Sequence, residues 1–204
     1  MKIEEYLSTL PSNILSGEEI QIPPDSIREI FRFADLGEND VFYHLGCGGG
    51  TSLSIARQEF NVKSAIGIDN SKKMIDIAKK SIENDKISDV RLIEQDVLEA
   101  DLSDASVILC WFMDPDIMES LMEKFEKLGD DVKIITIWAP LPGCLPQKVD
   151  FPYIMNKTPF VETDDLKKQL LAVFETECIG FVTAWEFAER YTKSIGRDNP
   201  ENDR

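Results

Sequence analysis

A strand-like apolar run followed by closely spaced glycines is the part of this sequence that most directly indicates chemistry. The run covers residues 41–45, and Gly46, Gly48 and Gly50 follow it at alternate positions. Glycine lets the backbone turn sharply and approach a ligand with no side chain in between. A second apolar run ends in Asp69, about 20 residues further on, where a carboxylate can accept hydrogen bonds from both hydroxyls of a ribose. The pattern therefore predicts a site for a nucleoside-containing cofactor.

The glycine spacing narrows the choice of cofactor. A dinucleotide fingerprint requires a further glycine three positions after its second one, and Thr51 occupies that place. A cofactor without pyrophosphate fits better, and a dehydrogenase is the less favoured alternative. A merely flexible loop is the other alternative, but the preceding strand, the amphipathic stretch at 52–60 and the acid at 69 argue against it.

Length and composition indicate the class of protein. The chain has 204 residues, of which 43% are apolar, as expected for one globular domain. No apolar run approaches the ~20 residues that cross a bilayer, and no charged-then-apolar leader opens the chain. The four cysteines form no C-x-x-C pair, which favours a reducing compartment. We expect a cytoplasmic protein with no membrane partner and no metal site.

The balance of charges limits the partners. With 38 acidic and 22 basic residues, the net charge is −16. Such a surface repels the phosphate backbone, so free nucleic acid is not an expected substrate. A basic protein would be attracted, although acidity that serves only solubility is an equally open alternative.

Hydrophobic periodicity predicts alternating strands and helices. A proline-led helix starts near Pro23, and the sequence then alternates strands at 41–45, 65–68, 90–94, 107–112 and 132–138 with helices at 52–60, 71–84 and 115–127. The fold class is therefore α/β, with a doubly wound, mostly parallel sheet and helices on both faces. Ligands of such folds bind beyond the carboxyl ends of the strands, where the glycines, Asp69, Asp96 and residues 111–114 all fall.

Composition divides the chain into four segments. We expect an N-terminal helical segment at 1–22 with a short helix at 3–10, an α/β core at 23–138, a proline-rich insertion and C-terminal completion of the same domain at 139–195, and a tail at 196–204.

Prolines 140, 142, 146, 152 and 159 predict a long shaped loop, which either wraps the substrate side of the pocket or is a plain connector. A helix at 164–175, capped by Thr163, should follow. Residues 179–191 suit a strand and a helix equally.

Three of these motifs resemble those of class I S-adenosylmethionine-dependent methyltransferases. They are residues 41–50, Gly67 to Asp69, and Glu94 to Val97. The resemblance implies a Rossmann-like fold with S-adenosyl-L-methionine as cofactor, held by the glycine loop under its methionine and ribose, by Asp69 at the ribose hydroxyls and by Asp96 at the adenine amino group. Val97 would pack on adenine. The residues expected at the cofactor are His44, Gly46, Cys47, Gly48, Gly50, Asp69, Asn70, Asp96, Val97 and Phe112.

Three short segments resemble a more specific family, the archaeal and mitochondrial broad-specificity protein-lysine methyltransferases. These segments are the proline-led start at 22–24, residues 41–48, and the exit from the fifth strand at 138–143. The chain departs from the superfamily at His44, where an acid is usual, and from the lysine family at Gly49 and Thr51. His44 either contacts the cofactor or is a buried packing histidine, and Asp96 is either a ligand or a helix cap.

The expected catalytic residues are Trp111, Asp114 and Trp138. Trp111, Phe112 and Trp138 end the fourth and fifth strands and can form an aromatic wall around a lysine chain, although such residues are more often plain core. Asp114 either orients the incoming amine or caps the helix before Pro115. A small-molecule methyltransferase and a cofactor-binding protein without catalysis are the alternative functions.

Overall fold

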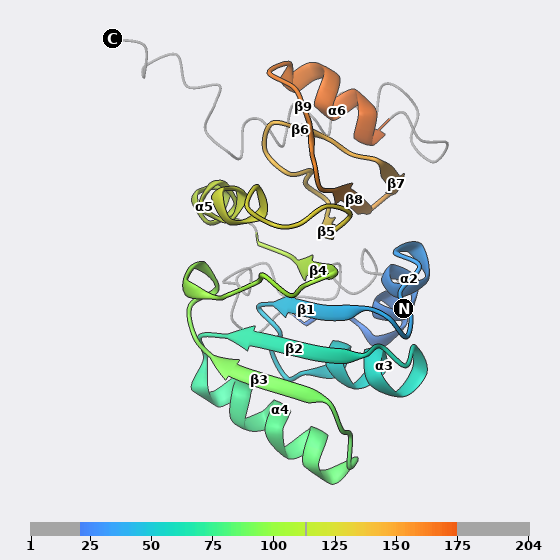
Figure 1. Ribbon diagram of the computed structural model, residues 1–204, viewed down its shortest axis with the longest axis vertical. Helices are drawn as coiled ribbons and strands as arrows, with labels where there is room; N and C mark the ends of the chain where they lie inside the picture. The colour runs from blue at the N-terminus through green and yellow to red at the C-terminus, as the bar shows by residue number, and fades with distance from the viewer. Residues whose placement is uncertain (1–20, 113, 175–204) are drawn as a thin grey trace, which may run out of the picture.

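A computed structural model describes residues 21–112 and 114–174 of the chain, and Figure 1 shows their arrangement. The expected helix at 3–10, the ambiguous stretch at 179–191 and the tail lie outside the described residues. In the described part, no helix is long and apolar enough to span a bilayer.

The core of the fold is one seven-stranded sheet with the order β3-β2-β1-β4-β5-β8-β7. The first five strands are mutually parallel, and β8 is antiparallel to both of its neighbours. Figure 1 shows β1, β2 and β3 side by side with their arrowheads at the same edge. The predicted doubly wound, mostly parallel α/β fold is confirmed. The strand bounds are β1 Val41–Leu45, β2 Ser64–Asp69, β3 Val90–Glu94, β4 Val107–Cys110, β5 Lys133–Ile137, β7 Lys148–Asp150 and β8 Tyr153–Lys157.

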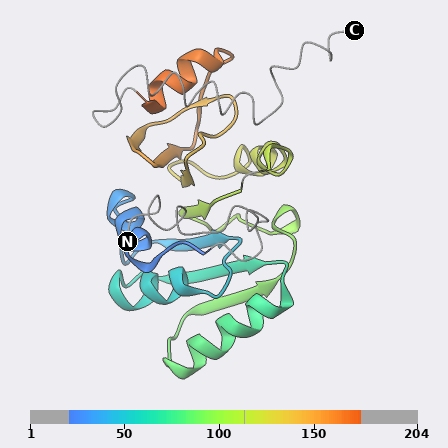
Figure 2. The same ribbon diagram turned by 180° about the vertical axis from the view of Figure 1, so that it is seen from behind.

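The helices bury their apolar stripes against the two faces of this sheet. One face packs against α2 (Pro24–Phe33), α3 (Thr51–Glu59) and α4 (Lys72–Asn84). The other packs against the 3-10 turn η1 (Val97–Glu99) and α5 (Pro115–Phe125). The helix α2 lies beside α3, as Figures 1 and 2 both show. The predicted bounds of α3, α4 and α5 are confirmed to within two residues at each end, and α2 begins one residue after the predicted start.

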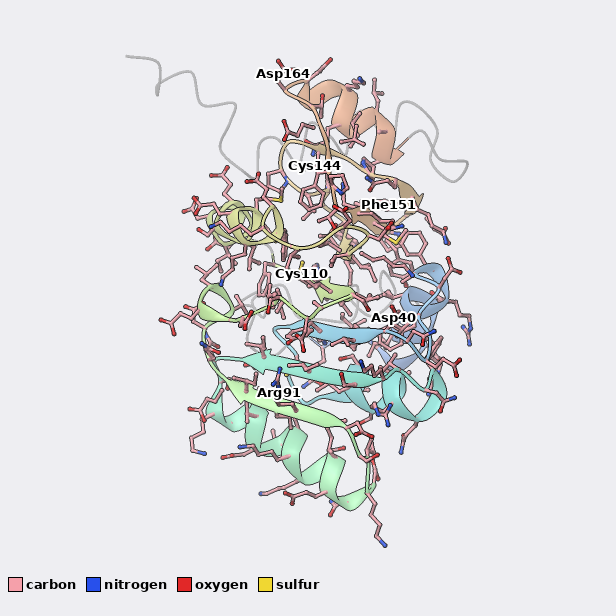
Figure 3. All side chains as sticks on the ribbon, viewed as in Figure 1. Asp40, Arg91, Cys110, Cys144, Phe151 and Asp164 are labelled. Atoms are coloured by element: carbon pink, nitrogen blue, oxygen red, sulfur yellow. The ribbon has the colours of Figure 1, made fainter. Side chains whose placement is uncertain are left out.

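The proline-rich segment was expected to be a loop, and that expectation is wrong. It contains β7 and β8, which extend the main sheet, and a second small sheet formed by β6 (Cys144–Leu145) and β9 (Val161–Glu162). Pro152 immediately precedes β8, and Pro159 follows it after one residue. Because these prolines flank the strand, they remove no donor from its ladder. Figure 3 shows Cys144 and Phe151 of this segment on the opposite side of Cys110 from Arg91 of β3.

Several boundaries also differ from expectation. The strand β4 ends at Cys110 instead of residue 112, and β5 ends at Ile137 instead of residue 138. The last helix, α6, covers Leu166–Phe174. Its first turn is capped by Asp165, whose Oδ1 accepts from the Lys168 amide at 3.1 Å, while Thr163 Oγ1 accepts from the Asp165 amide one step earlier. The strand ends matter because they release Trp111, Phe112 and Trp138 from the ladder.

Gly67 in the middle of β2 lets the glycine loop pack directly on the sheet. A Cβ atom added to Gly67 would lie 2.5 Å from Leu53 Cδ1 and 2.7 Å from Cys47 Sγ, both of which are buried. The absence of a side chain on β2 therefore makes room for the loop and the first turn of α3.

We expect Gly67→Ala to lower the free energy of unfolding by about 1–3 kcal/mol, because the added methyl group overpacks a full core. Urea unfolding measures this change. Gly37→Ala is the matched control, since a Cβ atom there would meet nothing within 4 Å, and it should change stability by less than about 0.5 kcal/mol. Equal effects of the two substitutions would contradict this packing.

Candidate active site

The bend after β1 is built from glycines that adopt left-handed backbone angles. The φ angles of Gly46, Gly48 and Gly50 are 77°, 52° and 79°. A side chain at any of these positions would be strained. At Gly50 it would also meet Ala78 Cβ of α4 at 2.9 Å. The three glycines therefore allow the sharp turn that the sequence predicted, because other residue types disfavour these backbone angles.

The bend is fastened to the end of β2 by three successive amides. Gly46 N and Cys47 N donate to the carbonyl oxygen of Ile68 at 2.8 and 3.0 Å. Gly48 N donates to Asp69 Oδ2 at 2.8 Å. These bonds fix the bend against the strand end that carries the acid.

Asp69 links the bend to the next helix as well. Its second oxygen, Oδ1, accepts from the Ser71 amide at 2.9 Å, where α4 begins. An ionised carboxylate offers about four lone-pair positions. The two described bonds leave capacity for ligand hydroxyls, and the residue is half-buried, so its carboxylate keeps contact with the surface.

Cys47 contributes packing rather than reactivity. Its side chain is buried against β2. Burial, together with the nearby charge of Asp69, raises the pKa of the Cys47 thiol to about 12. The thiol therefore stays protonated at neutral pH and does not act as a nucleophile.

His44 is a buried residue beneath the first turn of α3. Its exposed fraction is 6%, and Nδ1 lies 2.6 Å from Ser52 Oγ. Burial lowers the pKa of the imidazole to about 4. The ring is therefore neutral near pH 7, and one of its nitrogens is already engaged by the protein.

The third strand brings a second carboxylate next to Asp69. Gln95 N donates to the Asp69 carbonyl oxygen at 3.1 Å, which aligns the two strand ends. Asp96 is exposed, and its Oδ1 accepts from the Leu98 amide at 2.9 Å, so it caps η1. Val97 is buried in the core, and Asn70 is exposed directly after Asp69. Asp69, Asn70 and Asp96 thus share one edge of the sheet.

The end of β4 meets the glycine bend from the other side. Leu45 of β1 pairs with Cys110 of β4, so the residues that follow both strands are neighbours. The Phe112 ring lies 3.4 Å from the place where a Gly46 Cβ atom would be. Phe112 and Gly46, both predicted as cofactor residues, are therefore brought together.

The three predicted catalytic residues follow β4 and β5. Trp111 and Trp138 are half-buried and pack on the α2–α3 side of the sheet. The indole N–H of Trp111 is buried and has no acceptor among the described residues. Asp114 caps α5, because its Oδ1 accepts from the Asp116 amide at 2.9 Å. Of the two roles that the sequence allowed for Asp114, the structure therefore shows the helix cap, which uses one of the two carboxylate oxygens.

Trp138 has an unusual backbone. Its φ angle is 72°, a left-handed value that is rare for bulky residues, and its amide donates to the Pro152 carbonyl oxygen at 2.8 Å. Such strain persists only where surrounding structure holds it, and it is concentrated at functional sites.

One residue beside the bend was not found from the sequence. Gln21 lies against Gly48 and Gly49, just before the first turn of α2. No motif joins position 21 to position 48, so only the packing of α2 reveals this contact.

Comparison with known proteins identifies the family. Residues 44–148, which include the glycine bend, Asp69 and the ends of β4 and β5, match the family described as the ANTKMT methyltransferase domain. The chain belongs to this family. The predicted S-adenosylmethionine-dependent methyltransferase is thereby confirmed, and the inactive alternative and the dehydrogenase are disfavoured.

Individual relatives of this ANTKMT-family chain have several activities. A protein-lysine N-methyltransferase of Saccharolobus islandicus is 27% identical over 132 residues, which are 64% of this chain and 81% of that protein. A carboxy-S-adenosyl-L-methionine synthase of Sulfurimonas denitrificans is 35% identical over 103 residues, covering 48% of this chain and 43% of that protein. An RNA methyltransferase of Salinibacter ruber, solved with S-adenosyl-L-homocysteine, has a TM-score of 0.65 at 22% identity and covers 72% of this chain and 98% of that one. This last likeness shows the shared fold.

The neutral state of His44 gives a prediction about pH. The pKa of His44 in the folded protein lies below its unfolded value of about 6.5, so protonation favours unfolding. Its contribution to stability is complete above about pH 6.5 and is lost as the pH falls towards 4.

NMR can test this at one resonance, because His44 is the single histidine of the chain. Its imidazole protons should show no titration between pH 7.5 and 5 in the folded protein, and a midpoint near 6.5 in urea. A folded-state midpoint above pH 6 would contradict the buried, neutral ring.

Proposed function

We propose that this chain transfers a methyl group from S-adenosyl-L-methionine to lysine side chains of proteins. The observation that carries the choice of acceptor is the pair of half-buried indoles, Trp111 and Trp138, which follow the adjacent strands β4 and β5. The protein-lysine N-methyltransferase of Saccharolobus islandicus supports the same acceptor. The net charge of −16 favours a basic protein over a nucleic acid.

The residues of the strand ends fit the methyl donor. Asp69 retains lone pairs for the two ribose hydroxyls, and the left-handed backbone of Gly46 and Gly48 shapes the bend along which the chain of the donor would lie. Asp96 has one oxygen outside its capping bond for the adenine amino group. Because Val97 is buried, only its edge would touch adenine. His44 and Cys47 are buried and would support the bend from beneath, whereas Asn70 is exposed and could contact the donor. The Phe112 ring would border the donor beside Gly46.

When bound, the donor supplies an activated methyl group on a sulfonium, which an in-line nucleophile removes. The protein must therefore align the nucleophile and exclude water rather than activate the methyl group. The acceptor amine must be neutral, and a lysine with a pKa near 10.4 is almost entirely protonated at pH 7. The apolar rings of Trp111 and Trp138 would lower that pKa by desolvating the ammonium form. Asp114 keeps one oxygen outside its cap bond to orient the incoming amine.

Trp138 allows a paired test of this role. Trp138→Ala and Trp138→Gly both remove the ring, so each should reduce the rate of methyl transfer far more than the affinity for the donor. The two variants differ in stability, because alanine retains the cost of a left-handed backbone at φ 72° and glycine does not.

We expect the free energy of unfolding of Trp138→Gly to exceed that of Trp138→Ala by about 1 kcal/mol. At positions with negative φ, alanine is usually the more stabilising of the two residues. Urea unfolding gives the stabilities, and calorimetry with single-turnover assays separates binding from transfer. Equal losses in donor affinity and transfer rate would remove Trp138 from the acceptor side.

The acceptor class is tested with a donor whose methyl group carries a radiolabel. Incubation with a cell extract should label protein bands, and complete hydrolysis in strong acid followed by amino-acid analysis should recover the label as methyl-lysine. Label found only in material of low mass would favour a metabolite as acceptor, and label in RNA would favour a nucleic acid. Either of these results would overturn the lysine assignment. The Trp138→Gly protein is the control that retains donor binding.

A further inference from the structure

The side chain of Gln21 covers the outer surface of the glycine bend. A Cβ atom built on Gly48 would lie 3.6 Å from both Cγ and Cδ of Gln21. One built on Gly49 would lie 3.3 Å from Oε1 and 3.4 Å from Nε2 of the same residue. The carboxamide therefore occupies space that side chains at positions 48 and 49 would fill.

The position of Gln21 is fixed by its neighbours. Ile22 is 7% exposed and belongs to the core, and the Pro23 carbonyl oxygen accepts from the Ile27 amide at 3.0 Å in the first turn of α2. Since α2 packs on α3, the helix that follows the bend, the backbone at residue 21 is held beside the bend.

The hydrogen-bonding capacity of this carboxamide is almost unused. Its Nε2 lies 3.9 Å from Met74 Sδ, and a thioether is a weak acceptor. Its Oε1 accepts no bond from any residue in the described ranges 21–112 and 114–174. The residue is exposed, so both groups are available to a ligand at the bend.

The partners proposed above for the donor, all within the described residues, leave its amino-acid end unassigned. Asp69 can take the ribose hydroxyls, but the amino-acid end of the donor carries an ammonium and a carboxylate. His44 is neutral, buried and bonded to Ser52, so it offers no charge to either group. A carboxamide provides a donor for a carboxylate and an acceptor for an ammonium in one side chain.

We propose that Gln21 is a cofactor-binding residue that hydrogen-bonds the amino-acid end of S-adenosyl-L-methionine. This inference rests on the proposed function, since it assumes that the donor lies along the glycine bend. It extends the site to the start of α2 and explains the bare backbone at Gly49, because a side chain there would press on the carboxamide.

The test compares two ligands that share ribose and adenine. S-adenosyl-L-homocysteine carries the amino-acid end, and 5′-methylthioadenosine lacks it. Affinities of the wild-type protein, Gln21→Ala and Gln58→Ala are measured by calorimetry, or by saturation-transfer NMR where binding is weak. Gln58 is the matched control, because it is an exposed glutamine near the C-terminal end of α3, whereas the bend precedes the N-terminal end of that helix.

We expect Gln21→Ala to weaken S-adenosyl-L-homocysteine about tenfold, the usual effect of losing a hydrogen bond to a charged group. The affinity for 5′-methylthioadenosine should stay within about twofold, and Gln58→Ala should bind both ligands like the wild type. The KM for the donor should rise in Gln21→Ala with little change in kcat.

Two results would overturn the role of Gln21. An unchanged affinity for S-adenosyl-L-homocysteine would show that the carboxamide makes no contact, and an equal loss for both ligands would show that it acts only by shaping the bend. A wild-type protein that bound neither ligand would instead contradict the proposed function itself. Thermal unfolding without ligand should be the same for all three proteins, since both glutamines are exposed.

Discussion

The attachment of the glycine bend to the carboxyl end of β2 is the constraint on which the site depends. Three consecutive amides donate to that strand end, two to the Ile68 carbonyl oxygen and one to the Asp69 carboxylate. A hydrogen bond to a charged acceptor contributes about 1.5–3 kcal/mol, more than a neutral one. The bend is thereby shaped before any ligand arrives, which lowers the entropy cost of binding.

Asp69 consequently has two roles in the proposed site. It closes the bend through Gly48 and begins α4 through Ser71, and it would accept the ribose hydroxyls with its remaining lone pairs. Loss of this acid would therefore disturb the bend as well as remove a ligand contact. Gly67 completes the arrangement from the sheet side, because its missing side chain lets Cys47 and Leu53 pack against β2.

Much of this architecture could be predicted from local pattern. Short apolar runs and helical repeats located the five parallel strands and the helices that cover them. The glycine spacing with Asp69 predicted a cofactor site at the carboxyl edge of the sheet. The proline-rich segment was misassigned because prolines 152 and 159 forbid a strand only at their own positions, and β8 fits between them. The contact of Gln21 and the left-handed backbone of Trp138 could not be predicted, since both arise from packing between distant segments.

The most direct test of the account is a crystal structure of the protein with S-adenosyl-L-homocysteine. The account predicts that both ribose hydroxyls lie within hydrogen-bonding distance of the Asp69 carboxylate, with the amino-acid end along Gly46 to Gly48. Ligand density away from this edge, or a bend that opens and releases the Gly48 amide from Asp69 so that the hydroxyls contact neither, would contradict it.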